Sequence, residues 1–203
     1  MKVVAIMGSY RKGNTIDTLV DRAIEGALST RPDAEIDKII LTDQHIEYCK
    51  NCGACRRDDP EKSIARCVID DDMQQILPAM CEADAYIFGV PIFEGTVNAL
   101  TKTFLERICW TLSKAGRRPV KGCPEPRTAK KRRAILILST GIISPLLRRF
   151  CDDATKLVKS TLGITLSAKL VGSLYAGATE KVGEAGNTKY EEKARRLGTK
   201  LAR

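Results

Sequence analysis

The chain lacks any apolar run long enough to cross a membrane. Roughly 18 consecutive apolar residues are needed for that, and no stretch of the 203 residues approaches this length. The first residues, MKVVAIMGSYRKG, hold an apolar stretch too short for a secretory signal, with no small-residue cleavage site before Arg11 and Lys12. Because 43% of the residues are hydrophobic and 29% are charged, as in ordinary soluble domains, we expect a cytoplasmic protein without a membrane partner.

Aromatic residues and histidine are also scarce. Aromatics make up 5% of the chain, and its one histidine, His45, is expected at the surface. The formal net charge of +9 could suit nucleic acid. However, nine basic residues and one acidic residue lie between Lys114 and Arg133, so nine minus one, or +8, of this charge sits in a basic loop. The loop has no interleaved aromatics on which bases could stack. It indicates a solvated flap or a contact for an anionic partner, and we expect no nucleic-acid partner.

Disulfides are not expected, although the chain has eight cysteines. In a reducing compartment thiols stay free, so clustered cysteines indicate metal, cluster or redox chemistry. Cys49, Cys52 and Cys55 are spaced C-x2-C-x2-C, a run that can hold one corner of an iron–sulfur cubane. Zinc, which more often uses two separated C-x2-C pairs, remains an alternative, as do a vestigial site and redox thiols.

Short apolar runs alternate with segments of helical spacing along the chain. Strands are predicted at 2–7, 35–41, 84–90, 134–140 and within 168–174. Helices are predicted at 15–28, near 71–80, at 96–112, at about 145–162 and at about 188–202. This alternation predicts an α/β fold, a doubly wound five-stranded parallel sheet with helices on both faces. We expect one domain over 1–203, with a cysteine-rich insertion at about 42–69 and the basic loop at about 114–133.

The first predicted strand ends in a loop, GSYRKGNT, that is one residue short of a nucleotide-triphosphate loop. Asn14 stands where such loops carry the lysine that reaches the terminal phosphates. The loop also lacks G-x-G-x-x-G, so a dinucleotide pyrophosphate fits poorly. A helix N-terminus with free N–H groups still binds anions. Ser9, Arg11 and Thr15 add donors and charge. The loop therefore indicates a monophosphate site, and a turn that binds nothing is the alternative.

A second loop, PIFEGTVNA, follows the third predicted strand. Phe93 offers an aromatic face, Gly95 allows a flat ligand to approach the backbone, and Thr96 and Asn98 offer polar contacts. Strands one and three flank the switch point of a sheet ordered 2-1-3-4-5, where ligands bind. An ordinary hydrophobic turn is the alternative, but two such loops at one switch point favour a ligand site.

The chain resembles the flavodoxin-like NAD(P)H-dependent FMN reductases. The resemblance lies in these two loops, in the longer stretch PIFEGTVNALTKTFLER and in the acidic DDDM before the second helix. With the cysteines, the chain is most similar to the iron-sulfur flavoprotein branch, most clearly over Lys2 to Arg107. The resemblance implies that the first loop binds the FMN phosphate through Ser9, Arg11, Gly13, Asn14 and Thr15. It implies that the second loop lines the flavin ring with Pro91, Ile92, Phe93, Glu94, Gly95, Thr96 and Asn98. The loop after the fourth strand would complete the pocket with Thr140, Gly141 and Ile142. Glu94 departs from the aromatic or small residue that family members often carry.

The same resemblance implies a [4Fe-4S] cluster on Cys49, Cys52, Cys55 and a fourth cysteine. Cys67 lies just before VIDDDM, where the family has its last ligand, although more residues precede it than in the family's compact run. Cys123, followed by proline, is the second choice.

The expected function is an FMN-dependent oxidoreductase that passes electrons between NAD(P)H or ferredoxin and an acceptor. The flavin supplies the reactivity, so no catalytic acid or base is predicted. The family also implies a homodimer or homotetramer. The alternatives are a flavodoxin-type electron carrier or redox sensor without turnover of its own, and a zinc-stabilised binding protein.

Overall fold

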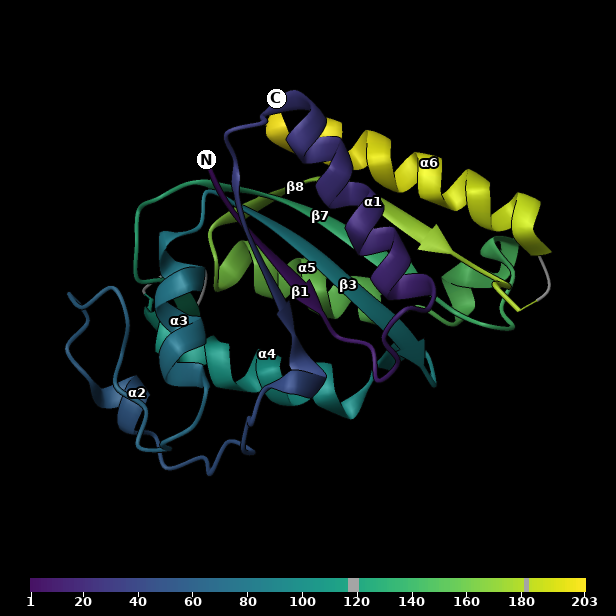
Figure 1. The fold of residues 1–203 in the computed structure, drawn as a ribbon. Coiled ribbons are helices and arrows are strands. Elements are labelled where there is room, and N and C mark those ends of the chain that lie inside the picture. The colour runs from purple at the N-terminus through teal and green to yellow at the C-terminus, as the bar shows by residue number, and fades with distance from the viewer. Residues whose placement is uncertain (117–120, 181–182) are drawn as a thin grey trace.

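The protein is built on a parallel β-sheet between two layers of helices (Figure 1). The computed structural model describes residues 1–116, 121–180 and 183–203. The parallel strands are β1 (Lys2–Met7), β2 (Glu35–Ile40), β3 (Ala85–Phe93), β7 (Arg132–Ser139) and β8 (Ala168–Ala176). Their order is β2-β1-β3-β7-β8, so the predicted 2-1-3-4-5 order of the parallel strands is confirmed. A sixth strand, β4 (Thr96–Val97), pairs antiparallel with the end of β3 and was not predicted.

Helices cover both faces of the sheet, as the apolar strands require. The central strands are buried on both sides, which is why they read as continuous apolar runs. One face packs against α1 (Thr15–Thr30) and α6 (Gly183–Ala202). The other face packs against α3 (Met73–Glu82), α4 (Ala99–Leu112) and α5 (Ala154–Ile164).

Two glycines allow α1 and α6 to touch backbone to backbone. A Cβ on Gly26 would lie 1.9 Å from the carbonyl oxygen of Arg195, and a Cβ on Gly198 would lie 1.8 Å from that of Ala23. Any side chain at either position would force the helices apart, so this face of the core depends on glycine at both positions.

Several element boundaries differ from the predicted ones, for local reasons. Strand β3 continues through Pro91, which stays paired with Ser139 of β7. The helix expected at 96–112 begins at Ala99, because Asn98 caps its first turn. The helix expected at about 145–162 is two elements, a 3-10 turn η2 (Pro145–Phe150) and α5. Between them the Asp152 carboxylate accepts a hydrogen bond from Thr155 N at 2.8 Å, which starts a new helix. The last helix starts at Gly183, before the predicted Thr188.

The cysteine-rich insertion and the basic loop pack against each other. The insertion contains η1 (Leu41–Asp43), the short α2 (Ala54–Arg57) and irregular backbone, and the loop contains a hairpin of β5 (Ser113–Ala115) and β6 (Pro124–Pro126). Arg127, 8% exposed, donates to the carbonyl oxygens of Cys55, Asp59 and Ser113 at 3.1, 2.7 and 2.8 Å. Residues 117–120 of the predicted basic loop lie outside the described residues. Part of the loop's positive charge is therefore used inside the fold and is not free to meet an anionic partner.

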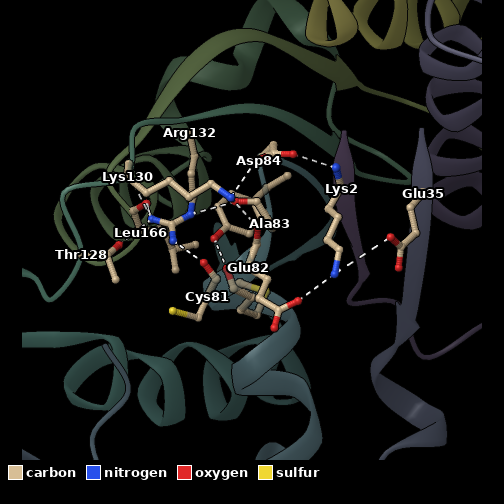
Figure 2. A network of polar contacts seen from close by, with 12 residues as sticks. Lys2, Glu35, Cys81, Glu82, Ala83, Asp84, Thr128, Lys130, Arg132 and Leu166 are labelled. Carbon is tan, nitrogen blue, oxygen red and sulfur yellow. Dashed lines mark hydrogen bonds and ion pairs between the residues drawn. The ribbon is translucent and has the colours of Figure 1, made fainter. Parts of the chain in front are cut away.

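A second buried arginine organises the amino ends of the strands, away from the predicted ligand loops (Figure 2). The guanidinium of Arg132, at the start of β7, donates hydrogen bonds to oxygens of Cys81, Ala83, Thr128, Lys130 and Leu166. Cys81 and Ala83 are at the C-terminus of α3, where a positive charge is favourable. Nearby, Lys130 pairs with Asp84 at 2.7 Å and Lys2 with Glu82 at 2.7 Å. This end of the molecule is filled by structural contacts, while the loops at the carboxyl ends of the strands are left for a ligand.

Across the described ranges, no helix is both long and apolar enough to span a membrane.

Candidate functional site

The two predicted loops are joined by direct hydrogen bonds. The Gly8 carbonyl accepts from Asn98 Nδ2 at 2.7 Å and from Thr101 Oγ1 at 3.3 Å. The rings of Tyr10 and Phe93 meet edge to face, 5.8 Å between centroids. The loops at the carboxyl ends of β1 and β3 are therefore in direct contact, as the adjacency of these strands in the sheet allows.

The first loop keeps the features of an anion site. Ser9 Oγ accepts from Arg11 N at 3.1 Å, which folds the loop back on itself. Asn14 is the N-cap of α1, yet its side chain makes no capping hydrogen bond and donates instead to the Lys12 carbonyl at 3.1 Å. The first N–H groups of a helix have no partner within the helix. Those at Thr15 and beyond thus remain available to a phosphate.

Asp17 is a functional candidate that the sequence reasoning missed. Its carboxylate accepts from Gly13 N at 2.6 Å and pairs with Lys38 at 2.6 Å. Burial acts to raise the pKa of Asp17, but the Gly13 and Lys38 contacts outweigh it, and the pKa lies below its ordinary value. Its place four residues after Gly13 was the available signal. The Gly13 amide is thereby engaged by a protein carboxylate, whose charge Lys38 offsets.

The second loop is a tight hairpin rather than an open turn. Residues Phe93 and Thr96 are paired across it, and Glu94 and Gly95 both have positive φ, at 46° and 80°. Two such residues form the type I′ turn that suits a two-residue hairpin. The Gly95 carbonyl accepts from the N–H groups of Asp153 and Ala154, at 2.7 and 3.1 Å. The hairpin tip is therefore fixed to the start of α5, with Glu94 directed to solvent.

A cavity of about 540 Å³ opens between this hairpin and the loop after β7. Seven residues of the predicted set line it: Ile92, Phe93, Glu94, Gly95, Thr140, Gly141 and Ile142. Phe150, Cys151 and Glu180 also line it, and no motif in the sequence pointed to them. The loop after β7 is fixed to the segment after β8, because the Thr140 and Gly141 carbonyls accept hydrogen bonds from Thr179 N and Glu180 N, each at 3.1 Å.

The remaining predicted residues have other surroundings. Asn98 is 2% exposed, and its amide is used inside the protein, with Oδ1 accepting from Thr101 N at 3.0 Å. Its part in the site is to join the two loops. Thr96 is exposed on β4, and Pro91 lies within β3, outside the lining of the cavity.

The four predicted cluster cysteines are free thiols in one region of the surface. Cys49 and Cys52 are exposed, and Cys55 and Cys67 are half-buried. Burial raises the pKa of Cys55, and the thiols of Cys67, Cys49 and Cys52 raise it further. Among the residues that the structure describes, no three or more Cys, His, Asp or Glu side chains are arranged to hold a metal ion. The sulfur donors have the chemistry that a cluster needs, but their side chains are not closed around one.

Comparison with known proteins decides the family. The family model described as NADPH-dependent FMN reductase matches residues 1–146, more than half of the chain. The chain belongs to this family. An iron-sulfur flavoprotein of Methanosarcina thermophila is 35% identical over 107 residues, 53% of this chain and 52% of that protein. One from Archaeoglobus fulgidus is 36% identical over 107 residues, 53% of this chain and 48% of that protein. The chain thus spans about half the length of the curated relatives that it matches.

Solved structures support the fold of this family member. An FMN-dependent NADH-azoreductase from Bacillus anthracis, solved in complex with FMN, has a TM-score of 0.71, with both chains covered to 100% and 13% identity. A flavone reductase has a TM-score of 0.69 at 20% identity, with 100% of this chain and 62% of that chain covered. The resemblance to the FMN reductases seen in the sequence and the predicted flavodoxin-like fold are confirmed.

Replacing Asp17 by asparagine should destabilise the protein by about 2 kcal/mol at pH 7, because two charge-assisted contacts are lost. A carboxyl whose folded pKa is lowered stabilises above its unfolded pKa, roughly 4, and this contribution disappears as pH falls through the folded value. The difference in melting temperature between wild type and Asp17→Asn should therefore shrink from pH 7 to pH 3.5.

The control is Asp21→Asn, which removes the second, more exposed partner of Lys38 and should cost below about 1 kcal/mol. A difference that stays constant with pH would contradict the ionic role of Asp17.

Proposed function

We propose that this chain binds FMN at the carboxyl ends of β1, β3 and β7 and works as an NAD(P)H-dependent flavin oxidoreductase. The observation that carries the proposal is the cavity between the Glu94–Gly95 hairpin and residues 140–143, beside a helix N-terminus that suits a phosphate. A flat ring and a single phosphate at one switch point describe FMN. The FMN-complexed azoreductase with the same fold supports it.

The protein's part in this chemistry is to bind and orient the flavin. FMN, when bound, supplies the hydride and electron transfer. The N–H groups at the start of α1, with Ser9, Arg11, Asn14 and Thr15, hold its phosphate. Phe93, Gly95 and Ile142 line the cavity and would pack against the ring and shield one side of it from water. The proposed electron donor is NAD(P)H, and ferredoxin is the alternative.

A [4Fe-4S] cluster on Cys49, Cys52, Cys55 and Cys67 is the second part of the proposal. Four thiolates provide the ligands for such a cluster, which carries single electrons. The similarity to iron-sulfur flavoproteins and the electrostatic coupling of Cys55 to the other three thiols support it.

We also propose that the chain works as a homodimer or homotetramer. Large apolar side chains beside the cavity are open to solvent: Ile142 is 64% exposed, Leu146 88% and Phe150 72%. Exposed apolar surface next to a ligand site is typical of an interface.

Arg11→Ala should weaken FMN binding about tenfold, since one charged contact to a phosphate is worth about 1.4 kcal/mol. Riboflavin, which has no phosphate, should bind the variant and the wild type equally. Fluorescence titration measures both. Lys12→Ala is the matched control, because Lys12 is already paired with Asp43. Equal affinity of the wild type for FMN and riboflavin would exclude the phosphate site.

The FMN-loaded protein should oxidise NADH or NADPH over many turnovers with a quinone as acceptor. Stopped-flow and steady-state absorbance measure this. A flavodoxin-type carrier or sensor would instead accept electrons once and stop, and this outcome would replace the enzyme by the alternative. The same assay with reduced ferredoxin identifies the donor.

Leu146→Asp should shift the mass of the FMN-bound protein to that of one chain, because a charge would enter an apolar interface. Light scattering measures the mass. Ile164→Asp, which changes an exposed aliphatic residue at the far end of α5, should leave the mass unchanged. A wild type that is already a single chain would rule out the oligomer.

A further inference from the structure

A buried ion pair lies directly beneath the cysteine-rich insertion. Arg107 of α4 is 3% exposed and donates to both carboxylate oxygens of Asp71, whose side chain is fully buried. Burying two charges is unfavourable unless their geometry is good and further hydrogen bonds satisfy them. The additional hydrogen-bond partners of the Arg107–Asp71 pair therefore indicate its structural role.

Those partners come from both ends of the cysteine segment. Arg107 Nη1 donates to the Glu47 carbonyl at 2.8 Å, and the Asp71 carboxylate accepts from Glu47 N at 2.9 Å. Glu47 is two residues before Cys49. Arg107 Nη2 lies 3.6 Å from Cys67 Sγ. One ion pair thus fixes the backbone that leads into the first cysteine and the thiol of the last one.

The guanidinium still has an unused donor. Arg107 Nε is buried and has no hydrogen-bond partner among the described residues. A buried N–H without an acceptor costs about 1–3 kcal/mol. Arg107 and Cys67 both line a cavity of about 540 Å³ between the insertion and α3, which the other three cysteines do not line. The guanidinium nitrogen that lies next to Cys67 is Nη2, and sulfur of a cluster bound through Cys67 would be an acceptor within its reach.

We infer that Arg107 is a positioning residue of the cysteine site. It holds Cys67 as the fourth sulfur with Cys49, Cys52 and Cys55, and it places the positive end of the Arg107–Asp71 pair next to that sulfur. The inference rests on the proposed cluster and deepens it. Hydrogen bonds and nearby charge set the reduction potential of a cluster. Arg107 therefore makes the cluster easier to reduce.

A contact to arginine distinguishes Cys67 from Cys123, because the Cys67 thiol lies 3.6 Å from Arg107 Nη2. Cys123 lies in the turn between β5 and β6, where its carbonyl accepts from Gly116 N at 2.7 Å. Arg127, which follows β6, donates hydrogen bonds to main-chain oxygens of the insertion, including those of Asp59 and Cys55. Arg127 is thus a natural control, a buried arginine that holds the same segment without touching a sulfur.

The test uses the FMN-loaded protein after anaerobic reconstitution with iron and sulfide. The readouts are iron per FMN and the midpoint potential of the cluster. Arg107→Lys keeps a positive charge to pair with Asp71 but removes the guanidinium N–H that contacts Cys67. The midpoint potential of the cluster should therefore become more negative. Arg127→Lys should leave it unchanged. Cys67→Ser should lower iron per FMN at least twofold from about four, whereas Cys123→Ser should not.

The double variant Asp71→Asn/Arg107→Gln replaces the ion pair by a neutral pair and serves where Arg107→Lys does not fold. It too should have a more negative potential. Potentials equal to wild type in both variants would reduce Arg107 to a structural residue, and iron loss in Cys123→Ser would reassign the fourth sulfur. Wild-type protein that binds FMN but takes up no iron would overturn this inference and the proposed cluster while leaving the proposed FMN site intact, whereas failure to bind FMN would overturn the proposed flavin function.

Discussion

The proposed flavin site depends on the hydrogen bonds that meet at Gly8. Its N–H donates to the Gly89 carbonyl at 2.8 Å, and its own carbonyl accepts from Asn98 and Thr101. A Cβ at this position would lie 2.3 Å from Thr101 Oγ1, so only glycine fits. Because the same contacts hold the start of the first loop and the cap of α4, a change at Gly8 would displace the phosphate and ring sides of the site together.

Of the 34 lysines and arginines in the sequence, three arginines are buried among the described residues and have structural roles. Arg107, Arg127 and Arg132 are each under 9% exposed and donate largely to main-chain oxygens or to Asp71. Arginine suits this work because its planar group has five donors and stays charged when buried. In this chain a positive net charge therefore reflects internal construction as well as surface potential. The two arginines at the insertion connect irregular backbone to the regular core, in place of secondary structure.

The proposed cluster would link metal binding to the folding of the insertion. Its described backbone is mostly irregular, with one helical turn, yet its two ends and its middle are fixed by Arg107 and Arg127. Under the proposal, the insertion would position its ligands approximately and the bound group would complete the arrangement. The four thiols lie near one another, but among the described residues they are not closed into a coordination sphere.

The sequence by itself determined the parallel sheet and its order, because strands buried on both faces must be apolar throughout and must alternate with amphipathic helices. It also identified the loops after β1 and β3, since glycine, proline and small polar residues interrupt the pattern there, whereas the loop after β7 was implied by the family resemblance. Only the tertiary structure decided which side chains meet. Asn98 is a loop connector, Asp17 occupies the Gly13 amide, and Arg107 reaches Cys67 from 40 residues away. The contacts of Asn98 and Arg107 join residues that are distant in the chain, so no local periodicity encodes them, whereas the Asp17–Gly13 contact is local and depends on how the first loop folds.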